Sequence, residues 1–245
     1  MPSEETDTSL PASVEAVWGL RGRPARGPKR ALSLERIVAA GVAVADREGL
    51  DALSMSRVAN AIGTSAMSLY RYVSAKDELL TLMVDAVYAD TWTIAATGRW
   101  RADLTQLAFN NLHTLRRHPW VVRVPVTGPP ITPHQLRWLE ASLAALRGTP
   151  LSGKEKIAVM LLVNSLVRND ATLMIDLRVG EPESEGKLPD YGKTLRLLLD
   201  PKHFPELIDV LDEGVFDYDD TSEQDFSWSL ERALDGVAAL IESKR

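Results

Sequence analysis

The sequence predicts an all-α protein with a small N-terminal head and a larger helical body. Apolar residues recur at intervals of three and four along most of the chain, as they do on one face of an α-helix. Proline and glycine mark the joints between these stretches, and no stretch shows the alternation of a half-buried strand. The 245 residues, 45% of them hydrophobic, suffice for a sizeable core. We divide the chain into a flexible basic arm over 1–31, a small helical head over 32–78 and a helical body over 79–245.

Composition and charge narrow the functional class. The chain has no cysteine, which excludes disulfides, thiolate metal sites and cysteine nucleophiles. No uninterrupted apolar run approaches the length of a membrane helix, and the acidic N-terminus lacks export-signal features, so we expect a cytoplasmic protein without a membrane partner. The net charge is −6, yet residues 21–78 carry 10 basic against 6 acidic residues, a balance of +4. A cationic head on an anionic body would be oriented by a DNA duplex.

The first thirty residues divide into an acidic start and a basic segment. Residues 21–30, RGRPARGPKR, contain five basic residues and cannot form a core. Arg21 and Arg23 belong to an Arg-Gly-Arg-Pro sequence that resembles an AT-hook, in which arginines enter a narrow minor groove. A solvated tail explains the segment equally well.

The helical head begins at Ser33, which can cap a helix whose apolar stripe includes Gly41 and which stops at Gly49. Ser54 can cap the next helix. In the following stretch Ala59 is small enough for two helices to cross closely, and Gly63 lies where the turn between them needs a residue tolerant of positive φ. This spacing predicts a helix-turn-helix; an αα-corner without a ligand is the alternative.

A recognition helix starting at Ser65 would face the major groove. Small residues there allow close approach, Ala66 or Met67 can contact a thymine methyl, and Arg71 can bind guanine through two hydrogen bonds. Tyrosine hydroxyls and Lys76 suit phosphate contacts. The predicted DNA-binding residues are Ser54, Ser56, Thr64, Ser65, Ala66, Met67, Ser68, Tyr70, Arg71, Tyr72 and Lys76, with Arg21 and Arg23 of the arm.

Helix-start signals continue through the rest of the chain. Ser74 followed by Asp77 predicts a capping box for the fourth helix. A helix from about Arg101 ends before Pro119, and Thr132 followed by proline predicts the start of the next. Residues 152–155, SGKE, form a capping box that opens a helix apolar nearly all round. A last helix runs from about 222 to 241, with a seam of apolar residues three and four positions apart: Phe226, Leu230, Ala233, Leu234, Val237, Leu240 and Ile241.

Enzyme signatures are absent or incomplete. Residues 148–155, GTPLSGKE, nearly match a phosphate-binding loop, but Glu155 replaces the hydroxyl that would hold Mg²⁺, and no strand precedes the segment. We read it as a turn between helices. The histidines lack metal-ligand spacing, and Asp217, Asp219 and Asp220 lack the glycine and distal glutamate of a calcium loop. We therefore predict no enzyme, no metal and no cofactor.

Residues 32–87 resemble the DNA-binding domain of the TetR family of transcriptional repressors. The resemblance is carried by GLDALSMSRVANAIGTSAMSLYRYVSAKDELL, and it continues more loosely in GRWRADLTQLAFNNLHTLRRHPW and GPPITPHQLRWLEASLAAL, which resemble tetracycline-repressor-like C-terminal domains. It implies a homodimer, a palindromic DNA operator and a small-molecule ligand that releases the DNA. It also implies that helices over about 153–177 and 222–241 of each subunit pair into a four-helix bundle, which suits their apolar surplus.

The resemblance also suggests where a ligand binds. By position, Trp92, Leu107, Asn111 and the loop from Pro125 to Gly128 fall where that subfamily contacts its drug. Pro125 replaces a histidine that helps to hold magnesium in the tetracycline repressors, so we predict neither tetracycline nor magnesium. Further candidates are Trp138, Asn164, Arg168 and Met174, for which a place in the core or at the dimer interface is the alternative.

Two questions stay open at this point. The ligand could release the DNA or promote its binding, because the sequence does not give the sign of the effect. The main functional alternative is a structural α-helical dimer without sequence-specific DNA binding.

Overall fold

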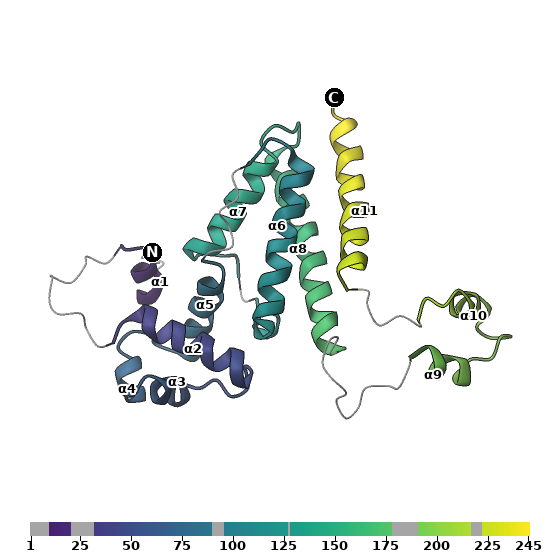
Figure 1. Ribbon diagram of the computed structural model, residues 1–245. Coiled ribbons are helices and arrows are strands. Elements are labelled where there is room, and N and C mark those ends of the chain that lie inside the picture. Colours follow the sequence, from purple (N-terminus) through teal and green to yellow (C-terminus); the bar gives the residue numbers. More distant parts are fainter. Residues whose placement is uncertain (1–9, 21–31, 90–95, 127, 178–190, 217–221) are drawn as a thin grey trace, which may run out of the picture.

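The protein is all-α over the residues that the structure describes, as predicted. The computed structural model describes residues 10–20, 32–89, 96–126, 128–177, 191–216 and 222–245 (Figure 1). Its elements are α1 (Ala12–Val17), α2 (Leu34–Glu48), α3 (Met55–Ala61), α4 (Ala66–Leu69), α5 (Lys76–Val87), α6 (Trp100–Arg117), the 3₁₀ helix η1 (Pro119–Arg123), α7 (Pro133–Ala145), α8 (Gly153–Asp176), α9 (Tyr191–Leu198), α10 (Pro205–Asp212) and α11 (Ser222–Glu242).

The head consists of α2 to α5, with α2 packed against both α3 and α5. Where α2 crosses α5, a Cβ placed on Gly41 would lie 2.7 Å from the Sδ atom of Met83. A side chain at this position would therefore displace the buried side chain of Met83. Ile37, Val44 and Leu79 are fully buried in the same core, so α5 is held to the rest of the head.

Helix α1 docks between the head and the body. The buried hydroxyl of Ser13 donates a hydrogen bond to Oε1 of Glu78 in α5, and Val14 is 3% exposed. At the other end, Nε1 of Trp18 donates to the carbonyl oxygen of Ile131, which precedes α7, at 2.8 Å. The segment predicted as a basic arm therefore contains a folded helix. Arg21 and Arg23 lie outside the described residues.

The body consists of α6, η1, α7, α8 and α11. The other elements pack around the long helix α8. Helices α6 and α11 both lie along α8, and α11 runs antiparallel to it (Figure 1). An ion pair of 2.9 Å joins Nζ of Lys244 to Glu155, so the residues just after α11 meet the first turn of α8. Phe226, Leu230 and Leu234 of α11 are almost fully buried, which confirms the predicted seam of this helix. Helices α9 and α10 pack on each other and lie apart from the body helices in Figure 1.

Local capping signals were predicted correctly at three helix starts. The Oγ atoms of Ser33, Ser54 and Ser152 accept backbone N–H bonds from the residue three positions later, and Ser152 forms the complete capping box with Glu155. The segment that resembles a phosphate-binding loop is thus a turn between α7 and α8. Its Glu155 is held ionised, because Lys244 and Ser152 lower the pKa of that carboxyl to about 2.

Two other helix starts differ from the prediction. Helix α5 begins after Ala75, and the N–H of Ser74 donates to Glu78 instead of taking part in a box with Asp77. Helix α7 begins after Thr132, whose side chain makes no cap. The start of α7 is capped from another helix, because Asp85 of α5 accepts the backbone N–H groups of His134 and Gln135.

Candidate DNA-binding surface and ligand cavity

The helix-turn-helix is formed by α3 and α4. Ala59 is 1% exposed where the helices cross, and Gly63 takes the positive φ of 70° that the turn requires, both as predicted. The N–H of Thr64 closes the turn on the carbonyl of Ala59 at 3.0 Å. Helix α4 is shorter than expected, because it ends at Leu69 after a single turn. Leu69 is fully buried and anchors that turn in the head.

Seven of the eleven predicted DNA-binding residues that the structure describes are exposed, along α3 and α4 and at the start of α5, and we call them the DNA-binding surface. Met67 is 76% exposed and Tyr70 is 48% exposed. Arg71 and Lys76 are also exposed, the latter at the first residue of α5. The remaining exposed members are Ser54, Ser56 and Ser65, while Thr64, Ala66, Ser68 and Tyr72 are half-buried.

Tyr72 and the serines have structural tasks within this surface. The hydroxyl of Tyr72 donates to the carbonyl oxygen of Leu32 at 3.1 Å, so it fixes the entry into α2 instead of pointing to a phosphate. The Oγ atom of Ser65 caps α4 by accepting the N–H of Ser68, and the two hydroxyl oxygens lie 3.0 Å apart. These contacts hold the short recognition helix in place.

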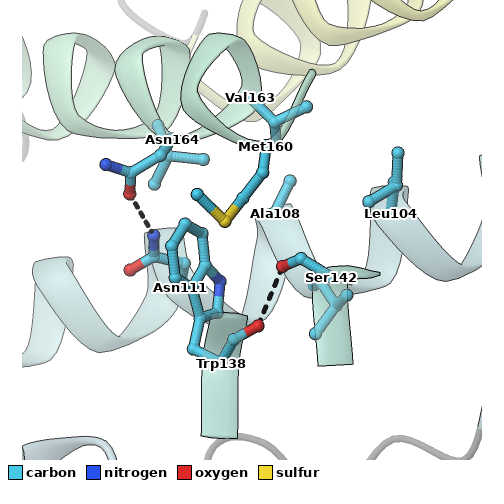
Figure 2. A pocket seen from close by; sticks show the side chains of 10 residues that line it. Leu104, Ala108, Asn111, Trp138, Ser142, Met160, Val163 and Asn164 are labelled. Carbon is cyan, nitrogen blue, oxygen red and sulfur yellow. Dashed lines mark hydrogen bonds between the residues drawn. The ribbon is translucent and has the colours of Figure 1, made fainter. Parts of the chain in front are cut away.

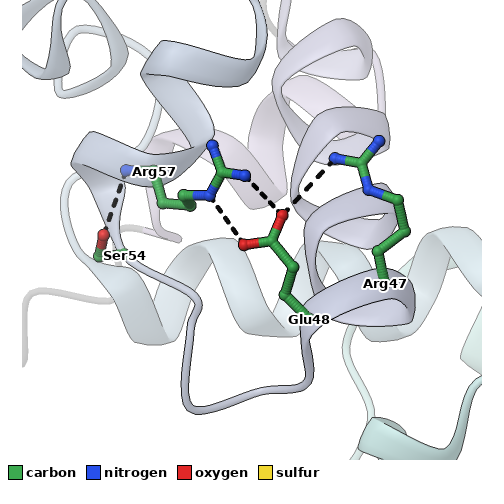
Figure 3. Close-up of polar contacts among 4 residues, drawn as sticks. All are labelled: Arg47, Glu48, Ser54 and Arg57. Carbon is green, nitrogen blue, oxygen red and sulfur yellow. Dashed lines mark hydrogen bonds and ion pairs between the residues drawn. The ribbon is translucent and has the colours of Figure 1, made fainter.

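An ion pair missed by the sequence reasoning fixes α3 against α2. Arg57 donates from Nε and Nη2 to the two carboxylate oxygens of Glu48 at 2.8 and 2.6 Å, and Arg47 approaches the same carboxylate at 3.8 Å (Figure 3). The hydrogen bond from Arg57 lowers the pKa of Glu48. The bidentate geometry ties the last turn of α2 to the first turn of α3, beside the Ser54 cap.

A narrow cavity lies between α6, α7 and α8. The cavity is small, with an empty volume of about 250 Å³ when its open mouth is included. The lining residues are Leu104, Leu107, Ala108, Asn111, Trp138, Ser142, Met160, Val163, Asn164 and Val167. Drug-sized ligands usually occupy more room, so a ligand must displace side chains such as Met160 to enter.

The polar groups of the cavity are two amides and one hydroxyl. Nδ2 of Asn111 donates to Oδ1 of Asn164 at 3.2 Å across the cavity, and the hydroxyl of Ser142 donates to the carbonyl oxygen of Trp138 (Figure 2). Behind the cavity wall, the hydroxyl of Tyr88 donates to Oδ1 of Asn111 at 3.1 Å. Burial raises the pKa of Tyr88 to about 12, with Arg168 opposing the shift, so this hydroxyl is neutral at ordinary pH.

Four of the predicted ligand-binding residues lie together in this cavity, namely Leu107, Asn111, Trp138 and Asn164. Pro125 and Gly128 are exposed and do not line it. Arg168 instead donates from Nη2 to the carbonyl oxygens of Val122 and Val124. Met174 is half-buried outside the lining, and Trp92 lies outside the described residues.

Sequence reasoning missed most of the apolar lining and one hydroxyl: Leu104, Ala108, Ser142, Met160, Val163 and Val167. Their spacing of three and four along α6 and α8 carries a signal for burial only, and the same pattern marks ordinary core residues. Among the described residues, no group of three or more histidine, aspartate or glutamate side chains could hold a metal ion.

Comparisons with known proteins agree with this architecture. Residues 37–83 match the family described as bacterial regulatory proteins, tetR family, and residues 95–241 match the tetracyclin repressor-like C-terminal domain. The HTH-type transcriptional repressor DrrR1 of Streptomyces coeruleorubidus is 35% identical over 257 residues, covering 99% of this chain and 92% of the relative. An HTH-type transcriptional regulator of Saccharopolyspora erythraea is 32% identical over 68% of this chain and 71% of its own length.

Solved structures show the same fold. The crystal structure of ActR from Streptomyces coelicolor in complex with actinorhodin superposes with a TM-score of 0.72 at 26% identity, covering 87% of this chain and 98% of that one. Apo ActR gives a TM-score of 0.75 at 24% identity over 89% of this chain and 100% of ActR. The match of family, relatives and fold leads to one conclusion: this chain belongs to the TetR family of transcriptional repressors, with a helix-turn-helix head and a tetracyclin repressor-like C-terminal domain.

Proposed function

We propose that the protein is a homodimeric repressor that binds a palindromic operator through α3 and α4 and leaves it when a small molecule occupies the cavity between α6, α7 and α8. The observation that carries this proposal is the position of α5. This helix begins with Lys76 at the DNA-binding surface and ends at Tyr88, which is hydrogen-bonded to the cavity residue Asn111. One helix therefore joins the two sites.

The dimer is proposed from the outer face of α8 and α11. Leu161 of α8 is 53% exposed and Trp228 of α11 is 63% exposed. The other exposed apolar residues of these helices are Ile157, Leu162, Leu173, Leu177 and Leu240. An apolar face of this extent on two adjacent long helices favours a partner with the same face, which gives the four-helix bundle over about 153–177 and 222–241.

This dimer also accounts for the apolar character of α8. By length and composition Gly153–Asp176 would be able to cross a membrane, and 28% of its most apolar stretch is buried within one chain. A single helix of this kind is weak support for a membrane span, because a bundle helix passes the same test. We propose a cytoplasmic protein whose partners are DNA, a second copy of itself and a small molecule, with no membrane partner.

The DNA contacts are proposed from exposure and chemistry. Met67 and Arg71 would face base edges, while Tyr70 and Lys76 would bind phosphates. Lys76 lies at the positive end of α5, which favours an anion. The exposed serines of the same surface would add further contacts to the DNA backbone; they are Ser54, Ser56 and Ser65.

The domain division is proposed as an arm at 1–31, a DNA-binding domain at 32–78 and a ligand-binding and dimerisation domain at 79–245. The two family matches support it, because the first ends and the second begins near the boundary between the head and the body.

The ligand is proposed to be an aromatic compound. Leucine, valine, methionine and tryptophan side chains make up most of the lining, and two amides supply its polarity. ActR, which has the same fold, binds actinorhodin. The family is one of regulators, so we propose no catalysis, metal or cofactor. A structural dimer without sequence-specific DNA binding is the alternative.

The experiment is a mobility-shift titration of the purified protein with DNA from upstream of its own gene, at several salt concentrations. We expect tight binding to one fragment and weak binding to unrelated DNA. Lys76→Met should weaken operator binding and lower the salt slope by about 0.9 for each phosphate that is no longer neutralised, hence about 1.8 for a dimer. Lys202→Met is the matched control, because Lys202 is exposed in the turn between α9 and α10. Equal, weak binding to every fragment would favour the structural alternative.

A further inference from the structure

The C-terminal turn of α5 is hydrogen-bonded to two walls of the cavity. Asp85 accepts the backbone N–H groups of His134 and Gln135 at 2.9 and 3.0 Å, at the start of α7. One turn later along α7, Trp138 lines the cavity. Tyr88 makes the second link, to Asn111 of α6. The walls that a ligand must displace are thus the walls to which the head is attached.

The hydrogen bond of Tyr88 and the polar contact inside the cavity share one residue, Asn111. Its hydroxyl donates to Oδ1 of Asn111, and Nδ2 of the same amide donates to Oδ1 of Asn164. These two bonds hold the Asn111 amide in one orientation. A ligand oxygen that replaces Asn164 as the partner of the Asn111 amide can turn this amide, and a turned amide no longer offers its oxygen to Tyr88.

The lining also limits the chemistry of the ligand. None of the lining residues is charged. The nearest cation along α8 is Arg168, one turn beyond Asn164, and its Nη2 is bonded to two backbone carbonyls of the segment after α6. A carboxylate in the cavity would therefore lose its hydration without gaining a lining cation. A hydroxyl or carbonyl oxygen, in contrast, matches the donor and acceptor groups of the two amides.

We propose that Asn111 and Asn164 select a neutral aromatic ligand with a hydroxyl or carbonyl oxygen at its edge, and that Tyr88 reports occupancy of the cavity to α5. The inference rests on the proposed function and specifies its ligand and its switch. When the ligand oxygen bonds to the Asn111 amide, that side chain turns and withdraws the acceptor from Tyr88. The end of α5 is then released from α6, and the head is free to leave the arrangement that fits the operator.

Tyr88 acts as a positioning residue, because it does not line the cavity and does not lie on the DNA-binding surface. Removing its hydroxyl removes a bond that exists only in the DNA-binding arrangement, while the ring keeps its packing. By linkage, Tyr88→Phe should then favour the ligand-binding arrangement in both equilibria. Operator affinity should fall and ligand affinity should rise, each by about 2- to 12-fold, the range expected for one hydrogen bond.

The experiment uses the full-length protein and three probes of similar size: 1-naphthol, naphthalene and 1-naphthoate. Binding is followed by tryptophan fluorescence, and operator affinity by fluorescence anisotropy of labelled DNA. We expect 1-naphthol to bind more tightly than the other two and to weaken operator binding. Asn164→Ala should reduce the preference for 1-naphthol over naphthalene. The matched control for Tyr88→Phe is Tyr191→Phe, which makes the same change on the exposed surface of α9.

The experiments test three claims separately: the relay from Asn111 through Tyr88 to α5, the class of ligand, and the proposed function. A fall in both affinities in Tyr88→Phe, or no change in either, would overturn the relay, because a packing role predicts no opposite shifts. Tighter binding of 1-naphthoate, or no binding by any probe, would overturn the ligand class. Amide hydrogen exchange at residues 84–88 needs neither DNA nor ligand, and it should accelerate in Tyr88→Phe and stay unchanged in Tyr191→Phe. If wild-type protein binds no operator, the proposed function fails, and this exchange measurement alone decides the relay.

Discussion

The carboxylate of Asp85 in α5 accepts the backbone N–H of His134 at 2.9 Å, so the first turn of α7 is capped by the helix that carries the DNA-binding head. The second oxygen lies 2.7 Å from Nδ1 of the same histidine, and Asp85 is 3% exposed. The local cap residue, Thr132, is fully buried, and its Oγ1 has no hydrogen-bond partner among the described residues. A side chain distant in sequence therefore takes the role of an N-cap.

This geometry predicts unequal effects for two neighbouring substitutions. Asp85→Ala leaves buried N–H groups of α7 without an acceptor, so it should lower the free energy of unfolding by about 1–3 kcal/mol. Thr132→Val keeps the side-chain shape and removes an unpaired hydroxyl, so it should be neutral or slightly stabilising. Urea unfolding followed by circular dichroism measures both. An equal loss in the two variants would show that Asp85 is not the cap.

Docking of α1 should depend on pH. Burial raises the pKa of Glu78, but hydrogen bonds from Ser13 and Ser74 outweigh it, and the net shift is downward. The ionised form is thus favoured in the folded state, which stabilises α1 docking above the ordinary carboxyl pKa of 4.5 and weakens it as the pH falls below that value. Hydrogen exchange of residues 13–17, corrected for the intrinsic effect of pH on exchange, should accelerate between about pH 5 and about pH 3.

Glu78→Gln should remove this pH dependence and speed exchange of α1 at neutral pH. Asp77→Asn is the matched control, because Asp77 is exposed in the same turn of α5. If the control alters exchange of α1 as much as Glu78→Gln does, the net charge of the turn is responsible and the contact with Ser13 is not.

Enlarging the cavity should lower the stability of the protein and raise its affinity for the ligand. Met160 is 7% exposed and lines the cavity. Met160→Ala should lower the free energy of unfolding by about 2–5 kcal/mol and should tighten 1-naphthol binding, because the ligand no longer has to displace this side chain. Val126→Ala, at a site 77% exposed, should change stability by less than about 0.5 kcal/mol. Weaker naphthol binding to Met160→Ala would place the ligand elsewhere.

The proposed dimer can be tested by one charge on α8. Leu161→Glu introduces a carboxylate into the apolar face, so sedimentation equilibrium should show a shift from dimer towards monomer. Leu197→Glu makes the same change at a site of α9 that is 88% exposed, and it should leave the mass unchanged. If Leu197→Glu alone caused the dimer to dissociate, the interface would lie on α9 and not on α8.

Elements whose structure depends on residues close to them in the sequence were predictable. Ser54 and Ser152 cap their helices through residues three positions away, and Gly63 is needed for one backbone angle. The recognition helix and the seam of α11 follow from the same local patterns. The single turn of α4 could not be predicted from helix propensity, because Tyr70 and Arg71 are compatible with a longer helix.

Contacts between distant segments could not be predicted. Nothing near Asp85 in the sequence points to α7, and the sequence context of Tyr72 suits a phosphate contact although its hydroxyl binds Leu32. For the cavity, position within the family indicated Asn111, but the pairing with Asn164 depends on how α6 packs against α8. A single sequence specifies which faces are apolar more readily than which polar groups meet.

The close approach of Gly41 and Met83 has a mechanical consequence. The Met83 side chain fills the space beside Gly41, so a movement of α5 against α2 would require this buried side chain to repack, and we expect the two helices to turn together. Helix α5 has 12 residues and is therefore about 18 Å long. A displacement of about 1 Å at Tyr88 would rotate this lever, and the head with it, by about 3°. In a two-fold symmetric pair the two heads would turn in opposite senses. A movement no larger than a change of side-chain rotamer would then alter the spacing between the two DNA-binding surfaces by the sum of both displacements.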